Sequence, residues 1–350
     1  MRLALRLADR AIELPLRLLP PMHPTAPTWR VTIAERARIR IAWPSTYQWA
    51  HACTFTETIR AALSRKGVLA IADVPQPYRG VVALWCTVDG RSHVVAIDFA
   101  DRPDLLSEEA LRECSLYIKL QYDERGYADS RIIPGGYPPS HLEYYQYLRA
   151  YRRSPAIRPR IDVAARFSYE FQRELRSRAV ERLSSASDIH FVGAGARVRY
   201  SRFLREASSA RLALDLPGNG PFTFRMPEIL GLGTCLMAPV YATALHEPLV
   251  PGVHYAPIAH DLSDLLDVCR YYLAHEHERA EIARAGRDYF DKYLHADHLA
   301  GYYLRTLLDV VGNDGETVES ANESTFDENL RISVADLDRC HRRPEAPVRL

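Results

Sequence analysis

The chain contains 350 residues with a mass of 39.8 kDa, which corresponds to about two domains of ordinary size. Hydrophobic residues make up 47% and charged residues 25% of the sequence, a composition that excludes a disordered chain and a membrane bundle. Because 45 basic residues balance 44 acidic ones, the protein has no overall field that would attract nucleic acid, and we expect no nucleic-acid partner.

Residues 1–20 combine leucine and isoleucine with arginines in a roughly amphipathic pattern that ends at Pro20 and Pro21. Two interpretations are open. One is a helix packed on the body of the protein or a frayed extension of it, and the other is a helix in the membrane interface, as basic amphipathic segments can form. The second would give a peripheral membrane contact. Prolines between positions 21 and 27 predict a linker, so residues 1–30 form a segment ahead of the first domain.

Residues 31–155 are predicted to form the first domain, because short apolar runs alternate with stretches of helical spacing. The predicted strands lie at 39–43, 81–85, 94–98 and 116–120, and the predicted helices at 56–63 and 144–151. Such alternation is typical of a doubly wound α/β sheet. Residues 152–159, with two prolines among arginines, predict the crossover to the second domain.

Residues 156–311 repeat the alternation and are predicted to form a second α/β domain. The predicted strands lie at 189–192, 211–216 and 234–240, and the predicted helices at 170–183, 200–207, 227–232, 262–274, 276–293 and 298–311. Gly193 and Gly195 are expected to end the first of these strands. Residues 312–350 are polar, and the acidic stretch within them predicts a flexible tail.

The stretch from Asp215 to Thr234 carries the strongest chemical signal. A predicted strand runs into a glycine-bearing loop, and Pro227 follows where proline suits the first turn of a helix. A helix start presents free backbone N–H groups that suit a phosphate or diphosphate, and Arg225 would add a bidentate guanidinium. Glu228 would accept hydrogen bonds from vicinal hydroxyls of a ribose or sugar. The alternative is that the helix dipole simply favours an acid there, and that the glycines form turns.

These residues resemble the C-terminal half of GT-B glycosyltransferases of the group 1 type, such as the spore-maturation-protein-like and capsule- or lipopolysaccharide-modifying enzymes. The motif is Phe224-Arg225-x-x-Glu228-x-x-Gly231-x-Gly233, with Tyr200-x-x-x-Leu204 before it and His254-Tyr255 after it. The resemblance covers roughly residues 188–311, whereas residues 31–155 match only as an architecture. It implies two Rossmann-like domains that face each other across a cleft.

The resemblance also implies that the second domain holds a nucleotide-sugar donor and the first domain an acceptor. By position, Arg225 would bind the diphosphate and Glu228 the ribose or sugar hydroxyls. Gly218 and Gly220 would allow the backbone to approach the donor closely. Tyr200 and His254 are further candidates for donor binding. Many relatives carry two glutamates eight positions apart, and in this chain Gly220 occupies the position of the first.

An acceptor hydroxyl needs a general base, and the first domain offers His51, Asp98 and Asp101. His51 lies between the first strand and its helix, where the alternative is a hydrogen-bonded structural histidine. Asp98 ends a predicted strand, where the alternative is a capping or loop role. Lys119 lies late in another strand and is a candidate ligand of the donor anion, with an ordinary edge lysine as the alternative.

No metal and no cofactor are expected. The six cysteines have no metal-ligand spacing, the dinucleotide and P-loop fingerprints are missing, and the Asp336-x-Asp338 pair lies in the predicted tail. The sequence also contains no run of about 20 apolar residues and no apolar stretch typical of a secretory signal near residue 1. We therefore expect a cytoplasmic protein that is either free or peripheral at the inner face of the membrane.

Three functions fit these patterns. The first is a metal-independent glycosyltransferase that moves a sugar from a nucleotide-sugar donor to a glycan or lipid-linked glycan in cell-surface polysaccharide synthesis. The second is a nucleotide- or glycan-binding module that keeps the scaffold without transfer. The third is an unrelated two-domain α/β enzyme in which the Arg225-x-x-Glu228 helix is a coincidence.

Overall fold

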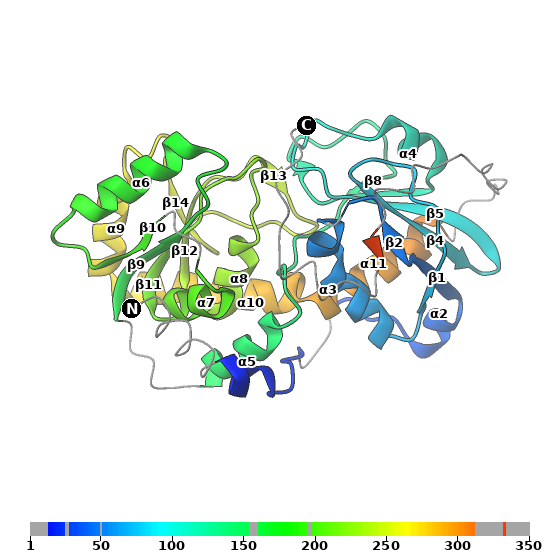
Figure 1. Cartoon of the computed structure of the whole chain (residues 1–350), viewed down its shortest axis with the longest axis horizontal. Coiled ribbons are helices and arrows are strands. Elements are labelled where there is room, and N and C mark those ends of the chain that lie inside the picture. The colour runs from blue at the N-terminus through cyan, green and yellow to red at the C-terminus, as the bar shows by residue number, and fades with distance from the viewer. Residues whose placement is uncertain are drawn as a thin grey trace. The chain divides into compact units, whose positions relative to one another are not determined.

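The computed structural model describes residues 13–24, 28–49, 51–153, 160–194, 198–311 and 332–333. The chain forms two compact α/β units (Figure 1), so the predicted α/β fold class is confirmed. Unit 1 consists of Met1–Thr25, Leu142–Ala242 and Glu247–His295, and unit 2 consists of Ala26–His141, Thr243–His246 and Ala296–Leu350.

Two helices lie in a different unit from the one expected from the predicted domain bounds, which placed residues 31–155 in the first domain and 156–311 in the second. Helix α5 (Tyr144–Arg153) packs in unit 1, where the Tyr144 hydroxyl donates a hydrogen bond to the backbone oxygen of Glu228 at 2.8 Å. Helix α11 (Ala296–Thr306) packs in unit 2, where Asp297 pairs with Arg65 of helix α3 (Ala52–Arg65) at 2.6 Å. Each unit is thus completed by a helix from beyond the predicted boundary.

Unit 1 contains a five-stranded parallel sheet with the spatial order β10-β9-β11-β12-β14. Its strands are β9 (Ile161–Arg166), β10 (Phe191–Ala194), β11 (Ala210–Leu214), β12 (Cys235–Pro239) and β14 (Ala256–Ile258). The chain adds β10 on one side of β9 and then β11 on the other. Ligands of open α/β sheets bind at such a switch point, outside the carboxyl ends of the strands, which here are Arg166 and Leu214.

Helices cover both faces of this sheet (Figure 1). Alternate strand residues such as Val163 and Leu212 pack with Ala179 of α6 (Arg173–Ser185) and Leu265 of α9 (Leu265–Ala274). On the opposite face, Ala164 and Ala213 meet α7 (Tyr200–Ser208) and α8 (Arg225–Leu232). The near-continuous burial of the inner strands β11 and β12 is what a parallel sheet covered on both faces requires, whereas the edge strand β10 is half-buried.

Unit 2 contains a mixed six-stranded sheet with the order β3-β1-β4-β5-β6-β8. Its strands are β1 (Ile39–Pro44), β3 (Leu69–Ala72), β4 (Val81–Val88), β5 (Arg91–Asp98), β6 (Leu116–Lys119) and β8 (Ile132–Pro134). Strand β4 runs antiparallel to β1 and β5. The turn at Asp89 and Gly90, with φ of 52° and 81°, has the left-handed backbone that two-residue hairpins need. A hairpin therefore interrupts the doubly wound alternation predicted for this region.

Smaller elements complete unit 2. They are α2 (Ile33–Ala37), α4 (Glu108–Glu113), the π-helical segment η2 (Leu307–Val311), and the paired short strands β2 (Thr46–Tyr47) with β15 (Ile332–Ser333) and β7 (Tyr122–Asp123) with β13 (Thr243–Ala244). In unit 1, helix α10 (Glu276–Tyr289) continues into the π-helical segment η1 (Phe290–Leu294), so the single helix predicted at 276–293 changes hydrogen-bond pattern before its end.

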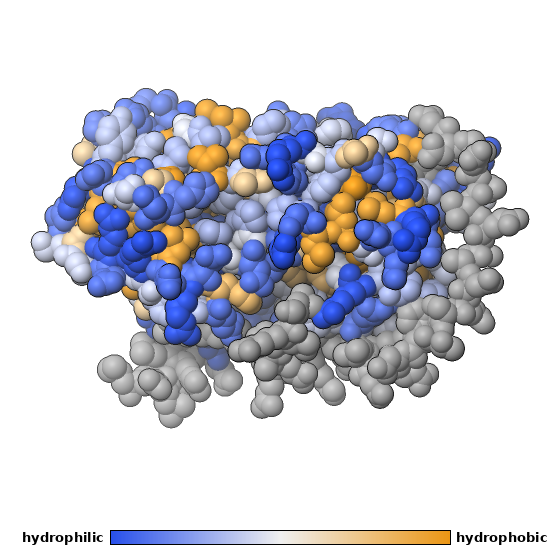
Figure 2. All heavy atoms as spheres, turned by 90° about the horizontal axis from the view of Figure 1, so that it is seen from above, coloured by the Kyte–Doolittle hydropathy of each residue, from blue (hydrophilic) through white to orange (hydrophobic). Residues whose placement is uncertain are grey.

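Several predictions fall outside the described residues. These are most of the crossover at 152–159, the glycine at position 195, residues 1–12 of the N-terminal segment, and the tail apart from 332–333. Within the described part of the chain, no helix has the length and apolar character needed to cross a membrane. Figure 2 shows apolar residues in separate places on a largely hydrophilic face, as on most globular proteins.

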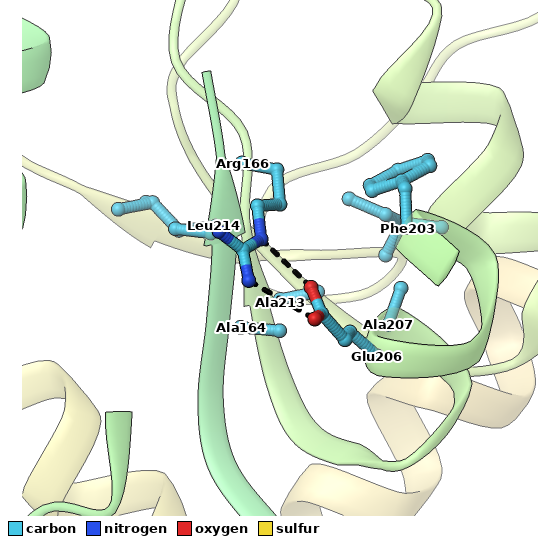
Figure 3. Close-up of a pocket in the computed structure, with 9 residues that line it drawn as sticks. Ala164, Arg166, Phe203, Glu206, Ala207, Ala213 and Leu214 are labelled. Carbon is cyan, nitrogen blue, oxygen red and sulfur yellow. Dashed lines mark hydrogen bonds and ion pairs between the residues drawn. The ribbon is translucent and has the colours of Figure 1, made fainter. Parts of the chain in front are cut away.

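A small pocket at the switch point is lined in part by the ion pair of Arg166 and Glu206 (Figure 3). The Glu206 carboxylate accepts hydrogen bonds from Arg166 at 2.7 and 3.0 Å and from Arg202 at 2.9 Å. Burial alone would raise the pKa of Glu206, but the hydrogen bonds from the two arginines lower it below its usual value of 4.5. The ion pair of Arg166 and Glu206 ties α7 to the end of β9.

The variant Glu206→Gln should lose acid-dependent stability. Because the folded pKa of Glu206 lies below the unfolded one, its contribution is present above pH 4.5 and is lost as the pH falls through the folded pKa. We expect a lower melting temperature at about pH 7 and a shallower fall toward about pH 3 than in the wild type. The exposed Glu181→Gln on α6 is the control, and parallel melting curves for Glu206→Gln and wild type would contradict the assignment.

Candidate functional site

The loop that joins β11 to α8 lies at the carboxyl edge of the unit 1 sheet and contains the predicted donor residues. The Gly218 N–H donates to the Gly220 backbone oxygen at 3.0 Å, which makes a tight turn. A Cβ atom on Gly218 would lie 3.4 Å from Nη2 of Arg176. A Cβ atom would therefore make an ordinary van der Waals contact with the Arg176 side chain, so the structure gives no support to a need for glycine at position 218.

The backbone N–H groups at the start of α8 are already bonded, which contradicts the prediction of free donors. The Arg225 N–H donates to Oγ1 of Thr223 at 3.2 Å. The N–H of Met226 donates to the Thr223 backbone oxygen, and that of Glu228 to the Phe224 oxygen. Pro227 has no N–H. An anion at this helix start would therefore depend on side chains and on the helix dipole.

Arg225 is the side chain best placed for an anion. Its Nε donates to Oδ1 of Asp215 at 2.9 Å and its Nη2 to the Leu216 backbone oxygen at 3.1 Å. Its guanidinium lies 5.3 Å from the ring centre of Phe167, a cation–π contact. The side chain keeps 19% exposure, whereas its partner Asp215 keeps 1%. One edge of the guanidinium is thus fixed to the protein while part of the group stays accessible.

A second arginine, Arg176 of α6, supports the same loop. It is 3% exposed and donates to the backbone oxygens of Ser168, Leu216 and Pro217 at 2.7, 3.2 and 3.0 Å. Burial, and then the nearby charge of Arg225, lower the pKa of Arg176 to about 10, so it remains a cation at pH 7. Two guanidiniums therefore face one carboxylate, and this part of the site is positive.

Glu228 lies in the interior of unit 1 with 2% exposure. The Tyr200 hydroxyl donates to Oε1 of Glu228 at 2.8 Å, and burial together with Glu228 raises the pKa of Tyr200 well above its ordinary value. Tyr200 therefore stays protonated and holds the carboxylate. The predicted donor ligand Tyr200 is placed here as a support for Glu228.

His254 lies in the loop before β14, where Nδ1 accepts a hydrogen bond from the Val250 N–H at 2.9 Å. The acceptor role of Nδ1 assigns the proton of the neutral ring to Nε2. Burial lowers the pKa of His254, and its ring centre lies 4.8 Å from that of Tyr289. His254 is a half-buried neutral imidazole at pH 7.

In unit 2, Asp98 and Lys119 form a buried ion pair, so the structure gives no support to their predicted roles as general base and donor ligand. Nζ of Lys119 donates to Oδ2 of Asp98 at 2.9 Å and to the backbone oxygens of Ala100 and Leu105. Asp98 also accepts from the Tyr117 hydroxyl at 2.5 Å. Lys119 is 0% and Asp98 1% exposed, so each charged group has the other as its buried partner at the ends of β5 and β6.

His51 is the histidine among the three predicted candidates for the general base. It directly precedes α3 and is half-buried, and its ring centre lies 4.7 Å from that of Trp49. Burial lowers the pKa of His51, so the imidazole is mostly neutral at pH 7 and able to accept a proton. Asp101 follows β5 in a half-exposed turn.

Sequence reasoning missed the partners that hold the site together: Asp215, Thr223, Tyr241, Arg176 and Phe167. One signal was available for Asp215, because it lies at the carboxyl end of the strand predicted at 211–216, the end at which α/β sheets bind ligands. Nothing in the sequence indicates that Arg176, on a helix 39 positions before Asp215, would reach this loop. Among the described residues, no group of three or more His, Cys, Asp or Glu side chains is arranged to hold a metal ion.

A family model described as "Glycosyl transferase-like" matches residues 171–308. This confirms the resemblance to glycosyltransferases for the segment that contains Arg225, Glu228 and His254. A curated relative, Protein O-glucosyltransferase 2 of Danio rerio, is 32% identical over 82 residues, which cover 23% of this chain. The chain matches only 16% of the length of that relative.

Solved structures with a similar fold include two bacterial proteins. A glycosyltransferase from Rickettsia africae has a TM-score of 0.38 and 10% identity over 57% of this chain and 64% of its own. Anabaena HepE in complex with UDP and glucose has a TM-score of 0.41 and 14% identity, with coverage of 61% and 70%.

Replacing Lys119 by methionine should destabilise the protein, because it leaves the Asp98 carboxylate buried without its cation. We expect the free energy of unfolding to fall by about 3 to 5 kcal/mol, measured by urea denaturation. The double variant Asp98→Asn/Lys119→Met should recover part of the loss. Arg102→Met, which removes the exposed Arg102–Asp104 pair, is the control and should leave the stability unchanged. A stable Lys119→Met protein that had lost nucleotide binding would restore Lys119 as a ligand.

Proposed function

We propose that the protein transfers a sugar from a nucleotide-sugar donor to a hydroxyl acceptor, and that Arg225 binds the donor diphosphate. The main support for this proposal is the Arg225 guanidinium, which is partly exposed and is fixed by Asp215 at the carboxyl edge of a parallel sheet. This edge is where α/β sheets bind ligands, and it lies inside the glycosyltransferase-like segment.

The charge of the site supports this function. Departure of a nucleoside diphosphate from the sugar develops negative charge, and fixed cations stabilise it without reorganising. Arg225 would contact the phosphates directly, and Arg176 would add positive potential from beneath the loop. The proposed transfer therefore draws its leaving-group stabilisation from arginine and from the α8 dipole, with no metal ion or cofactor assigned to it.

Glu228 and His51 have proposed roles on the two substrates. Glu228 would accept hydrogen bonds from ribose or sugar hydroxyls, with Tyr200 fixing one of its oxygens; because Glu228 is 2% exposed in this structure, this role requires that donor binding open access to its carboxylate. Gly218 and Gly220 would keep the neighbouring loop close to the donor, and His254 would line it. In unit 2, neutral His51 would take the proton of the acceptor hydroxyl. We propose a glycan or lipid-linked glycan acceptor in cell-surface polysaccharide synthesis.

The variant Arg225→Ala should lose nucleotide binding. Because a hydrogen-bonded charged contact disappears, we expect the affinity for the preferred nucleoside diphosphate to fall about 10- to 100-fold. Calorimetric titration with UDP, GDP, ADP and CDP, with and without chelator, measures this. Arg284→Ala, at an exposed arginine of the same unit, is the control.

Two results would contradict parts of this proposal. Undiminished binding by Arg225→Ala, with wild-type thermal stability, would remove Arg225 from the donor site. Saturable, Arg225-dependent binding without consumption of any nucleotide sugar would leave a binding module in place of a transferase.

We further propose that the N-terminal segment contacts the cytoplasmic face of a membrane. Residues 13–17 are helical, and Leu14 and Leu18, four positions apart, are 67% and 79% exposed. Leu18 lies in the turn that directly follows this helix, and burial of two exposed leucines in the membrane interface would be favourable. The arginines of residues 1–20 would favour anionic lipid.

The double variant Leu14→Ser/Leu18→Ser should bind vesicles of phosphatidylglycerol and phosphatidylcholine at least about tenfold more weakly than wild type, since burying one leucine contributes roughly 1.5 to 3 kcal/mol. A vesicle co-sedimentation assay measures this. Ile33→Ser, at a 78% exposed isoleucine of unit 2, is the matched control. Equal sedimentation of the double variant and wild type would reject the membrane contact.

A further inference from the structure

The buried carboxylate of Asp215 lies beside the proposed diphosphate site. Its negative charge is expected to weaken the binding of an anion there. Asp215 is 1% exposed and directly follows β11. A negative charge next to a diphosphate costs binding energy by Coulomb repulsion. The contacts of Asp215 provide a reason for its presence.

Asp215 is held by hydroxyl donors from two sides. Its Oδ1 accepts from Oγ1 of Thr223 at 2.7 Å, and its Oδ2 faces the Tyr241 hydroxyl at 3.4 Å. Burial and the charge of Asp215 raise the pKa of Tyr241 well above its ordinary value, so the phenol keeps its proton. The Asp215 backbone N–H also donates to the Met237 oxygen of β12 at 2.9 Å. The carboxylate is therefore a fixed point of the sheet edge.

From this point Asp215 fixes the orientation of Arg225. It takes the Nε donor, while the Leu216 oxygen takes one donor of Nη2 and the Phe167 ring lies against the guanidinium plane. Both donors on Nη1 have no hydrogen-bond partner among the described residues. Thr223 adds a second link, because its hydroxyl donates to Asp215 and accepts from the Arg225 N–H.

We propose that Asp215, together with Thr223, is a positioning residue that holds Arg225 with its Nη1 edge toward the donor diphosphate. This inference rests on the proposed function. An arginine side chain loses much rotamer freedom when it binds a ligand, and orienting it beforehand removes part of that cost. Supporting contacts of this kind hold binding groups in a productive geometry.

Inorganic pyrophosphate is the appropriate probe, because it contains the diphosphate without the base or the sugar. We expect calorimetry to show wild-type binding, and Asp215→Asn and Thr223→Val to weaken it about tenfold, the loss that follows from removing one charge-assisted hydrogen bond. The direction is diagnostic, because charge repulsion alone predicts tighter binding by Asp215→Asn. Thr223→Ser keeps the hydroxyl and should restore the affinity. Asp188→Asn, at a surface aspartate that pairs with Arg270 at 2.8 Å in the same unit, is the matched control.

A double-mutant cycle separates positioning from a general structural role. If Asp215 acts through Arg225, Asp215→Asn should have no further effect on pyrophosphate binding in the Arg225→Ala background. Tighter or unchanged binding by Asp215→Asn and Thr223→Val, with weaker binding by Arg225→Ala, would overturn the positioning role alone. Wild-type protein that fails to bind pyrophosphate, or Arg225→Ala that binds it normally, would overturn the diphosphate site itself.

Discussion

The ion pair between Asp215 and Arg225 connects the end of a sheet strand to the start of the helix that carries the glycosyltransferase-like motif. Because the sheet is parallel and covered on both faces, the position of Asp215 follows from the core, and Arg225 inherits its orientation from Asp215. The Thr223 hydroxyl accepts a hydrogen bond from the Arg225 N–H at the start of α8, and Arg176 donates to the Pro217 backbone oxygen in the loop between β11 and α8. The packing of the sheet therefore fixes Asp215, and Asp215 in turn fixes the arginine proposed to contact the diphosphate.

The sequence predicted a helix at 227–232, two residues short of the start of α8 at Arg225, and the strand before it, because both signals are local: an apolar run, a proline in the first turn and a motif of fixed spacing. It wrongly predicted free backbone donors there, because the Thr223 side chain and local carbonyls bond them. It also missed that Asp98 and Lys119 neutralise each other. Their pairing depends on the register of β5 against β6, in which the two residues are direct partners across 21 positions of sequence.

The same distinction between local and distant information explains the fold. In the second α/β block the apolar runs predicted β10, β11 and β12, but the sequence missed β9, which contains Asp162 and ends at Arg166, and β14, which is only three residues long. In unit 2 the Asp89–Gly90 hairpin turns the sheet into a mixed one, a local signal that the alternation of strands and helices obscured. Helices α5 and α11 complete units beyond the predicted boundaries, and only contacts with partners far along the chain, such as Asp297 with Arg65, reveal this.

A crystal structure of the protein with UDP would test the central claim most directly. The account predicts a phosphate oxygen within about 2.7 to 2.9 Å of Nη1 of Arg225, as charge-assisted hydrogen bonds require, with the Asp215–Arg225 contact retained. A UDP molecule bound in unit 1 with its diphosphate away from Arg225, or an Arg225 side chain that leaves Asp215 to reach the phosphates, would contradict it.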